Sequence, residues 1–446
     1  MLALPDTKPA EPSRTVGAFV STLFEEMSQL NIRYCVLHSA DKLPDALVSD
    51  LDLVVHPDDR RRLHLLLTRL TENGFSLIQD LEYAVNGRFL IFSWFAGGRV
   101  LSAAVDVVTE HRRDGLVLAS AQAMLSGRRK IRSIWVSHPR VELHYLLAKS
   151  ILKSTISHHG DRLCQLANEL GNEQAEIVAA ELLGRKVASE VVERCKAETL
   201  SEITPTLRRA LRRSALWRRP FACALHKARN SLRLGRRLIH PAGLMVVVLG
   251  PDGAGKSTLL EGLVRSTPGF RKHVSFHWRP RLIGKRAQHG PRNGRELPPH
   301  NWWRSSARLV MHVADYCLGY ICSVRPCITR TALVTFDRYY EDVLADPARY
   351  RYGGSMSLAK ALRALIPRPD LILVLDASEE IILSRKQEAS LEQIRQQRSA
   401  YLEIAGEHQN ARVISAAAPP LSVLAEAQRA ILDELEKRIR IRDQKY

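Results

Sequence analysis

Short apolar runs and helical patterns alternate through the first third of the chain. Between Arg33 and about Val136 the runs RYCVLH, LDLVV, FSLIQ, FLIFSW, AAVDVV and IRSIWV are rich in β-branched and aromatic residues, which is typical of strands. Between them, DDRRRLHLLLTRLTENG repeats its leucines at the spacing of one helix face. The pattern predicts a mixed α/β domain over 16–138, behind a loose polar tail at 1–15.

The middle of the chain has helical spacing and no strand pattern. The segments VELHYLLAKSILK, DRLCQLANEL and NEQAEIVAAELLG follow one another from about Pro139, and we place a helical extension at 139–200. A basic linker is predicted at 201–242. The apolar run LMVVVLG then opens a second α/β pattern, which predicts a further domain over 243–446.

Composition and charge narrow the class of protein. Hydrophobic residues make up 45% of the chain and charged residues 25%, which excludes a wholly disordered chain. The net charge of +19 favours an anionic partner, such as a phosphorylated substrate, a nucleic acid or an acidic membrane. The cysteines form no CxxC pair, so neither a disulfide framework nor a zinc module is indicated.

The chain shows no targeting or membrane-spanning pattern. Its start, MLALPDTKPAEPSR, lacks the apolar run of a secretory signal. The longest weakly charged apolar run, at 309–324, is interrupted by His312 and Asp315. We therefore expect a soluble, cytoplasmic protein.

The segment from Thr206 to His240 is strongly basic. It carries eleven Lys or Arg residues and no Asp or Glu, and so contributes +11 of the net charge. Three interpretations stay open: a solvated helical linker, a basic amphipathic helix on an anionic membrane, and a clamp on a polyanion such as nucleic acid. The second would make the protein peripheral at the membrane.

A Gly-rich sequence directly after LMVVVLG matches the pattern G-x-x-x-x-G-K-[ST] and precedes the helical pattern STLLEGLVR. Its glycines let backbone N–H groups face phosphates at a helix N-terminus. Lys256 would reach the β- and γ-phosphates, and Ser257 would offer its hydroxyl to Mg²⁺. The predicted ATP-binding residues are Gly250, Asp252, Gly253, Ala254, Gly255, Lys256, Ser257 and Thr258.

Three later segments select among the proteins that carry such a loop. ALVTFDRYY (332–340) predicts a buried strand ending at an Asp-Arg-Tyr sequence, and RPDLILVLDASEEIILSRKQE (368–388) predicts a second strand, a turn and a helix. RKQEASLEQIRQQRSAYLEIA (385–405) predicts a charged helix with Arg395 and Arg398 one turn apart. From Gly243 to the C-terminus, the loop and these segments together resemble thymidylate kinase, within the nucleoside monophosphate kinase superfamily.

The resemblance implies a P-loop NTPase fold, with a mostly parallel sheet flanked by helices. It implies transfer of the γ-phosphate of ATP to dTMP or another phosphorylated acceptor, with ATP and Mg²⁺ as cofactors, and more weakly a homodimer. By the family's motifs, Asp337 would assist Mg²⁺, Arg338 and Tyr339 would bind the acceptor, and Asp252 would meet its sugar hydroxyl. The implied catalytic residues are Lys256, Asp337 and, in the lid, Arg395 and Arg398.

The acceptor side departs from the family. His312 and Tyr316 occupy the places of the family's base-stacking Phe and base-contacting Arg. The region 271–330 carries twelve basic residues against two acidic ones, and three tryptophans, Trp278, Trp302 and Trp303. Guanidinium groups grip phosphate and rings cover sugar or base, so two interpretations stay open: an acceptor other than dTMP, such as a phosphorylated or lipid-linked sugar, and an elaborated lid with ordinary buried tryptophans.

Three Asp residues lie in apolar runs of the first domain. Leu37-His-Ser39, Asp50-Leu-Asp52 and Val105-Asp106-Val resemble the nucleotidyltransferase superfamily of minimal (MNT) type. The resemblance implies that Asp50, Asp52 and Asp106 hold Mg²⁺. His38 stands where the family has Gly, so three interpretations stay open: a working transferase, a degenerate binding or regulatory domain, and ordinary strand-end aspartates.

Two alternatives to the kinase remain. In the first, the N-terminal aspartates transfer a nucleotide and the P-loop domain is accessory. In the second, the protein is an ATP-gated binding protein that contacts a membrane or nucleic acid through 206–240; binding driven by nucleic-acid phosphates would weaken steeply with salt.

Overall fold

The computed structural model describes residues 14–37, 42–47, 49–84, 86–113, 116–218, 220–282, 297–385 and 390–443. Most of the tail predicted at 1–15 and the His38-Ser39 pair lie outside the described residues. The chain divides into two compact units, residues 1–96 with 101–235, and residues 97–100 with 236–446.

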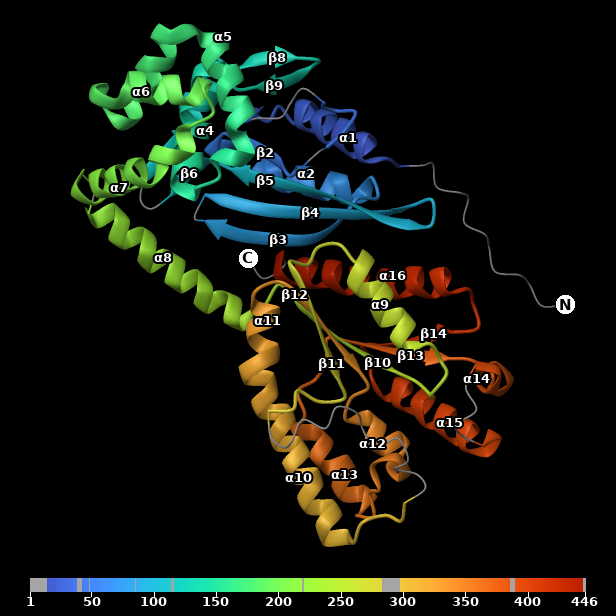
Figure 1. The fold of residues 1–446 in the computed structure, drawn as a ribbon. Coiled ribbons are helices and arrows are strands. Elements are labelled where there is room, and N and C mark those ends of the chain that lie inside the picture. Colours follow the sequence, from blue (N-terminus) through green and yellow to red (C-terminus); the bar gives the residue numbers. More distant parts are fainter. Residues whose placement is uncertain are drawn as a thin grey trace, which may run out of the picture. The chain divides into compact units, whose positions relative to one another are not determined.

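The first unit is built on a seven-stranded mixed sheet (Figure 1), in the order β3-β4-β5-β2-β1-β9-β8. At its centre β2 and β5 run parallel, whereas β1 and β2 run antiparallel. A separate two-stranded sheet joins β6 and β7. The strands are β1 (Tyr34–Val36), β2 (Leu51–Val55), β3 (Ser76–Ala84), β4 (Gly87–Ala96), β5 (Arg99–Val108), β6 (Glu110–Arg113), β7 (Leu116–Ser120), β8 (Arg129–Ile131) and β9 (Ile134–Val136).

Helices bury the two faces of this sheet separately. On one face Phe19 of α1 packs against Phe92 and Trp94 of β4, with ring centroids 5.1 and 5.4 Å apart. On the other, Val54 and Val108 belong to the core formed with the helices that follow. Since side chains alternate along a strand, Asp52 and Asp106 share this second face. The helical elements that precede this core are α1 (Val16–Gln29), η1 (Pro57–Asp59), α2 (Arg60–Glu72) and α3 (Ala121–Leu125).

A series of helices follows the sheet. It consists of α4 (Pro139–Lys153), α5 (Ile156–Leu183), α6 (Arg185–Lys196), α7 (Leu200–Arg218) and α8 (Pro220–Ile239). Helix α5 is kinked at Gly171, whose backbone has φ 76°. The predicted basic linker is thus largely helical, and the division between the two units falls inside it, at Gly235 and Arg236. Among the described residues, no helix is both long and apolar enough to cross a membrane.

The second unit is a parallel five-stranded sheet in the order β11-β12-β10-β13-β14. Its apolar strands are buried on both faces, as parallel strands between helix layers must be. Figure 1 shows helices on both sides of the sheet, which confirms the predicted parallel sheet flanked by helices. The strands are β10 (Leu244–Leu249), β11 (Lys272–His277), β12 (Ala332–Asp337), β13 (Leu371–Asp376) and β14 (Ala411–Ser415).

The helices of this unit divide between the two faces. Leu309, Tyr316 and Tyr401 pack with the odd-numbered residues of β10, while α9 packs with α16. Because the strands are parallel, the residues that follow β10, β12 and β13 meet at one edge of the sheet. The helical elements are α9 (Lys256–Ser266), α10 (Trp302–Gly319), the π-helical η3 (Tyr320–Val324), α11 (Arg325–Thr329), α12 (Glu341–Ala345), η4 (Pro347–Tyr350), α13 (Met356–Leu362), η5 (Arg363–Leu365), α14 (Glu379–Arg385), α15 (Leu391–Glu407) and α16 (Pro420–Asp443).

Candidate active site

The phosphate loop connects β10 to the first turn of α9. Gly253 and Gly255 both have φ 92°, in the left-handed region that a residue with a Cβ rarely adopts. At Gly250 an added Cβ would lie 2.7 Å from the carbonyl oxygen of Leu375, so a side chain cannot fit there. The loop therefore depends on its glycines, and it ends at a helix N-terminus, where an anion is favoured.

Lys256 is folded back onto this loop. Its Nζ donates hydrogen bonds of 2.8 Å to the carbonyl oxygens of Gly250 and Pro251 and lies 3.9 Å from Asp252. Burial, with the nearby positive charge of Arg338, lowers the pKa of Lys256 to about 8. Ser257 follows it in the first turn of α9 and is exposed.

Asp337 ends β12 beside the phosphate loop. It is the register partner of Val248 in β10, and its Oδ2 lies 3.4 Å from Nδ1 of His277. Its other oxygen, Oδ1, is buried and has no hydrogen-bond partner. Burial favours the neutral acid, but the hydrogen bond from His277 and the charge of Lys256 outweigh it, so the pKa of Asp337 is lowered. An ionised carboxylate with a spare oxygen fits Mg²⁺, which prefers oxygen ligands.

Arg338 connects β12 to the phosphate loop. Its backbone has φ 73°, and its N–H donates to the carbonyl oxygen of Val248 at 3.1 Å. Its buried guanidinium donates to Asp342 Oδ2 at 2.7 Å and to Asp252 Oδ1. Burial alone would lower the pKa of Arg338, but Asp342 and Asp252 raise it above its ordinary value.

A second arginine, Arg349, reaches the other carboxylate oxygen of Asp252. Although burial favours the neutral acid, Arg338, Lys256 and Arg349 together hold the pKa of Asp252 well below its usual range. Asp252 is thus an ionised carboxylate of the phosphate loop, and three cationic side chains surround it. Tyr339, in contrast, lies in the core, and its hydroxyl donates to the carbonyl oxygen of Pro367 at 2.7 Å.

The two arginines of α15 differ in their surroundings. Arg398 is paired with Asp376 at the end of β13, through Nε to Oδ1 at 2.6 Å and through a second nitrogen to Oδ2 at 3.1 Å. Arg395 has a side chain 61% exposed, and its ion-pair contacts within the described residues are long, 3.6 Å to Glu392 and 4.0 Å to Glu379. The pairing of Arg398 holds α15 to the strand end, and Arg395 is the more accessible cation.

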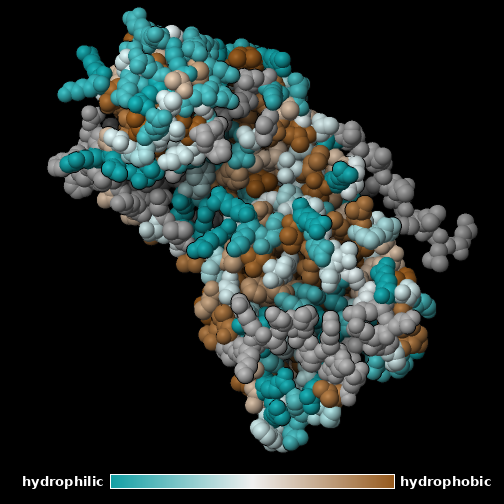
Figure 2. All heavy atoms as spheres, in the orientation of Figure 1, coloured by the Kyte–Doolittle hydropathy of each residue, from teal (hydrophilic) through white to brown (hydrophobic). Residues whose placement is uncertain are grey.

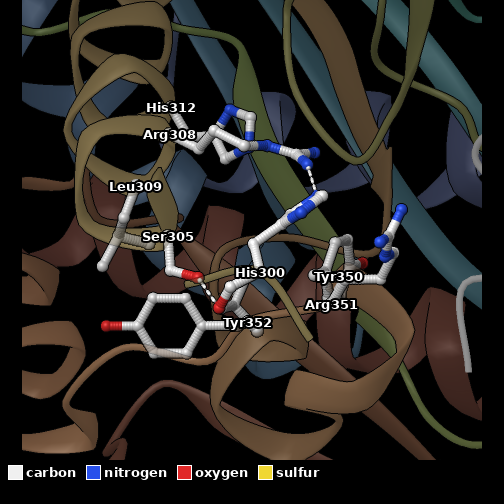
Figure 3. Close-up of a pocket in the computed structure, with 9 residues that line it drawn as sticks. His300, Ser305, Arg308, Leu309, His312, Tyr350, Arg351 and Tyr352 are labelled. Carbon is white, nitrogen blue, oxygen red and sulfur yellow. Dashed lines mark hydrogen bonds between the residues drawn. The ribbon is translucent and has the colours of Figure 1, made fainter. Parts of the chain in front are cut away.

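Asp252, Arg338 and Arg349 form the acceptor cluster. A pocket lies beside this cluster, on the side of α10 (Figure 3). Its walls come from the start of α10, from Val343 of α12 and from the residues around the end of η4. His312, predicted at the family's base-stacking position, lines it, whereas the hydroxyl of Tyr316 is hydrogen-bonded to the carbonyl of Trp278. Trp302 and Trp303 are exposed at the start of α10. The lining residues are His300, Ser305, Arg308, Leu309, His312, Val343, Tyr350, Arg351 and Tyr352.

In the first unit, two of the three predicted aspartates form one cluster. Asp52 and Asp106 are register partners of the parallel strands β2 and β5. The hydroxyl of Tyr83 donates to Asp106 Oδ2 at 3.1 Å, and Nζ of Lys149 lies 3.5 Å from Asp52 Oδ2. Burial and the charge of Asp52 raise the pKa of Asp106 to about 7, and its Oδ1 is buried without a partner.

The metal site predicted at Asp50, Asp52 and Asp106 stays a prediction. Asp50 precedes β2 and is exposed, and the ammonium group of Lys149 lies against Asp52. Across the described part of the chain, no group of three His, Cys, Asp or Glu side chains is placed to hold a metal ion. The sequence pattern gave no sign of Lys149, which lies 97 positions after Asp52.

The second unit has the parallel sheet and Gly-rich loop of a P-loop nucleotide-binding fold, and comparisons with known proteins add the family. Residues 248–427 match the family model described as thymidylate kinase. Thymidylate kinase of Xanthomonas campestris pv. campestris (strain B100) is 27% identical over 216 residues, 45% of this chain and 88% of that protein. The probable thymidylate kinase of Pyrobaculum aerophilum is 27% identical over 193 residues, 42% of this chain and 95% of that protein.

Among solved structures, thymidylate kinase from Ehrlichia chaffeensis has 18% sequence identity and a TM-score of 0.32, and the match covers 43% of this chain and 98% of that one. By its match to the family model, the region 248–427 is a thymidylate kinase domain.

Proposed function

We propose that the second unit transfers the γ-phosphate of ATP to an acceptor that already carries a phosphate. The observation that carries this proposal is the convergence of Lys256, Asp337 and Arg338 at one edge of the parallel sheet. Phosphoryl transfer needs little covalent chemistry from the protein, and positioning with positive charge accounts for most of the catalysis. The thymidylate kinase match supports the same class of reaction.

Each residue of the cluster has a proposed role. The loop N–H groups and Lys256 bind the β- and γ-phosphates, and Lys256 exchanges its two carbonyl acceptors for phosphate oxygens. Arg338, fixed between Asp342 and Asp252, holds the acceptor phosphate. Arg395 stabilises the migrating group from α15, and Arg398 positions that helix through Asp376.

Mg²⁺ would be held by Ser257 and Asp337, whose unpartnered Oδ1 suits a cation. When bound, the ion supplies positive charge to the β- and γ-oxygens.

An acceptor screen tests the proposal. Protein and ATP labelled at the γ-phosphate are incubated with dTMP, with other nucleoside monophosphates and with phosphosugars, and Lys256→Ala serves as the blank. Arg330→Gln is a charge-matched control, because Arg330 is exposed and precedes β12 at the opposite end of that strand. We expect the wild type and Arg330→Gln to label one class of acceptor, and Lys256→Ala to label none. If the wild type binds ATP but labels none of the phosphorylated acceptors, the proposed phosphoryl transfer is contradicted.

The first unit has a second candidate function, as a nucleotidyltransferase-like domain. The pairing of Asp52 with Asp106 on adjacent parallel strands, beside Lys149, supports it. The double variant Asp52→Asn, Asp106→Asn separates the two functions. Release of pyrophosphate from a nucleoside triphosphate should disappear while γ-phosphate transfer persists. Loss of γ-phosphate transfer in a folded double variant would instead favour the P-loop domain as the accessory one.

Contact with an anionic membrane through 206–240 is supported by one feature of α8. Leu225, Leu232 and Ile239 follow one another at seven-residue spacing, so they share a helix face, and they are 52%, 71% and 69% exposed. Sedimentation with vesicles tests this contact. We expect binding to vesicles rich in phosphatidylglycerol, little binding to pure phosphatidylcholine, and loss of binding in Leu232→Glu. Equal binding to both vesicles would contradict it.

A further inference from the structure

Among the described residues, the lining of the pocket beside the acceptor cluster contains cationic side chains and no Asp or Glu. Arg308 and Arg351 lie on either side of His300, and a nitrogen of Arg308 is hydrogen-bonded to Nε2 of His300, as Figure 3 shows. Arg351 donates through Nε to the carbonyl oxygen of Pro298 at 2.9 Å. Within the ranges that the structure describes, no Asp or Glu is ion-paired with Arg304, Arg308 or Arg351.

The pKa values of His300 and Arg308 reflect the excess of positive charge in this pocket. Burial, and then the charges of Arg304, Arg351 and Arg279, lower the pKa of Arg308. Burial and three arginines also lower the pKa of His300. Unpaired charges that are partly removed from water are costly unless an opposite charge joins them. The pocket is therefore a place where a bound anion would relieve repulsion that the free protein carries.

His312, which lines the pocket, and Trp278, which packs behind it, each carry a polar atom that has no hydrogen-bond partner among the described residues. Nδ1 of His312 and Nε1 of Trp278 are buried and make no hydrogen bond. The ring of Trp278 stacks on Tyr350 at 4.6 Å and meets His312 edge-on at 4.8 Å. Buried polar atoms normally have partners, so these two indicate groups that a ligand or water satisfies.

The pocket adjoins the cluster that we assign to the acceptor phosphate. Tyr350 lines the pocket, and its hydroxyl donates at 3.2 Å to Asp342, the carboxylate that also holds Arg338. Arg349, the residue before Tyr350, reaches Asp252. One acceptor molecule could therefore place a phosphate at Arg338 and its other end among His300, Arg308 and Arg351.

We propose that this pocket binds a second anionic group of the acceptor, a phosphate or a carboxylate. The inference rests on the proposed function, since it takes the phosphate held by Arg338 as the first anionic group. It narrows the acceptor to a molecule with two anionic ends, such as a bisphosphate or a phosphorylated acidic sugar. A nucleoside monophosphate such as dTMP would place a neutral base among these arginines and leave their charge unpaired.

Equilibrium binding tests the inference without turnover. Calorimetric titrations use matched pairs that differ by one anionic group: dTMP against thymidine bisphosphate, and glucose phosphate against glucose bisphosphate and glucuronic acid phosphate. The last two separate a phosphate from a carboxylate as the second group. We expect at least one dianionic-ended ligand to bind about tenfold or more tightly than its partner, the gain of one charge-assisted contact.

Variants test whether the tighter binding of ligands with two anionic groups comes from this pocket. Arg308→Gln should remove most of the preference and change the affinity for the monophosphates less than about twofold, while Arg308→Lys, which keeps the charge, should retain part of it. Arg330→Gln should leave the preference unchanged. Equal affinity within every pair, or an equal loss for both members of a pair in Arg308→Gln, would overturn the inference.

The outcomes for the two proposals are separable. A preference for dianionic ligands that depends on Arg308, found without any phosphoryl transfer, would support the pocket and contradict the proposed function. Phosphoryl transfer to dTMP with no preference for any dianionic ligand would support the proposed function and contradict the pocket.

Discussion

Arg338 at the end of β12 forms an ion pair with Asp252 in the phosphate loop, 86 positions earlier in the chain. The same guanidinium is held on its other side by Asp342. Because carboxylates hold the buried guanidinium on two sides, its direction is fixed before any substrate arrives. The pair thus joins the proposed ATP-binding loop to the proposed acceptor site.

Asp252→Asn should reduce turnover more than substrate affinity. The change leaves Arg338 with one carboxylate and releases Arg349, so the acceptor phosphate is held at a wrong position, and we expect kcat to fall about 100-fold. The free energy of unfolding should fall by roughly 3 kcal/mol, because buried charges lose their partner. Steady-state kinetics and urea unfolding measure the two effects.

Asp370→Asn is the matched control. Asp370 precedes β13, at the end of the sheet away from the loop, where it pairs with Arg438. This variant should lose stability and keep its kcat. An Asp252→Asn protein with wild-type kcat would contradict a positioning role for the Arg338–Asp252 pair.

The affinity for ATP should fall as the pH rises through about 8, the pKa of Lys256. Phosphate favours the charged lysine, so above this pH the free protein must take up a proton on binding, and affinity should drop about tenfold from about pH 7 to about pH 9. Titrations in buffers of different ionisation enthalpy should show that proton uptake. Lys256→Arg should give a flat profile, and a flat wild-type profile would contradict the assignment.

The same shift has the opposite effect on stability. The pKa of Lys256 in the folded protein lies below the ordinary value of 10.5, so between about 8 and that value the unfolded chain binds more protons. This residue therefore makes the free energy of unfolding increase with pH in that window. Comparison of the wild type with Lys256→Met by urea unfolding isolates the contribution, and an identical pH dependence in both proteins would count against it.

Arg395 and Arg398 should respond differently to substitution. Arg395→Gln should lower kcat about 100-fold with little change in melting temperature, since its side chain is 61% exposed and only distantly paired. Arg398→Gln should also lower the melting temperature, because it breaks the bidentate contact with Asp376. Thermal unfolding alongside steady-state kinetics distinguishes them. A large loss of stability in Arg395→Gln, or full activity in that variant, would contradict this division.

Asp106 should make the first unit less stable above neutral pH. Burial and Asp52 raise the pKa of Asp106 to about 7, above the ordinary 3.8. Between these two pH values the folded protein binds more protons than the unfolded chain, so the free energy of unfolding falls as the pH rises through this range. Asp106→Asn removes the buried charge and should raise the free energy of unfolding at about pH 8 by roughly 1 to 3 kcal/mol. The gain should shrink toward pH 5. A variant less stable than the wild type at about pH 8 would refute this account.

Local sequence patterns predicted the parts of the fold that depend on residues close together in the chain. The run LMVVVLG, the glycines after it and Lys256 predicted a strand, a loop and a helix, and the structure has all three. The roles predicted for Asp337 and Arg338 came from the family resemblance, and the structure places both residues beside the phosphate loop. The parallel sheet of the second unit was implied by the family resemblance, and the structure confirms it.

Tertiary contacts decided what the sequence did not reveal. His300, Arg308 and Arg351 come from the segment before α10, from α10 and from the end of η4, and no local spacing relates them. Lys149 reaches Asp52 from a helix 97 positions away. The lid arginines looked equivalent at i, i+3, but only Arg398 reaches the strand end at Asp376. Charge composition alone pointed to an anion in the region 271–330.

Phosphorus NMR of the reaction mixture tests the central claim most directly. The wild type, Mg²⁺, ATP and the acceptor found in the screen should give ADP together with new coupled resonances of a diphosphate on the acceptor, and Lys256→Ala should give neither. ADP with free phosphate alone would mean hydrolysis, and pyrophosphate with a nucleotide-linked product would mean nucleotidyl transfer. Either result would contradict phosphoryl transfer to a phosphorylated acceptor.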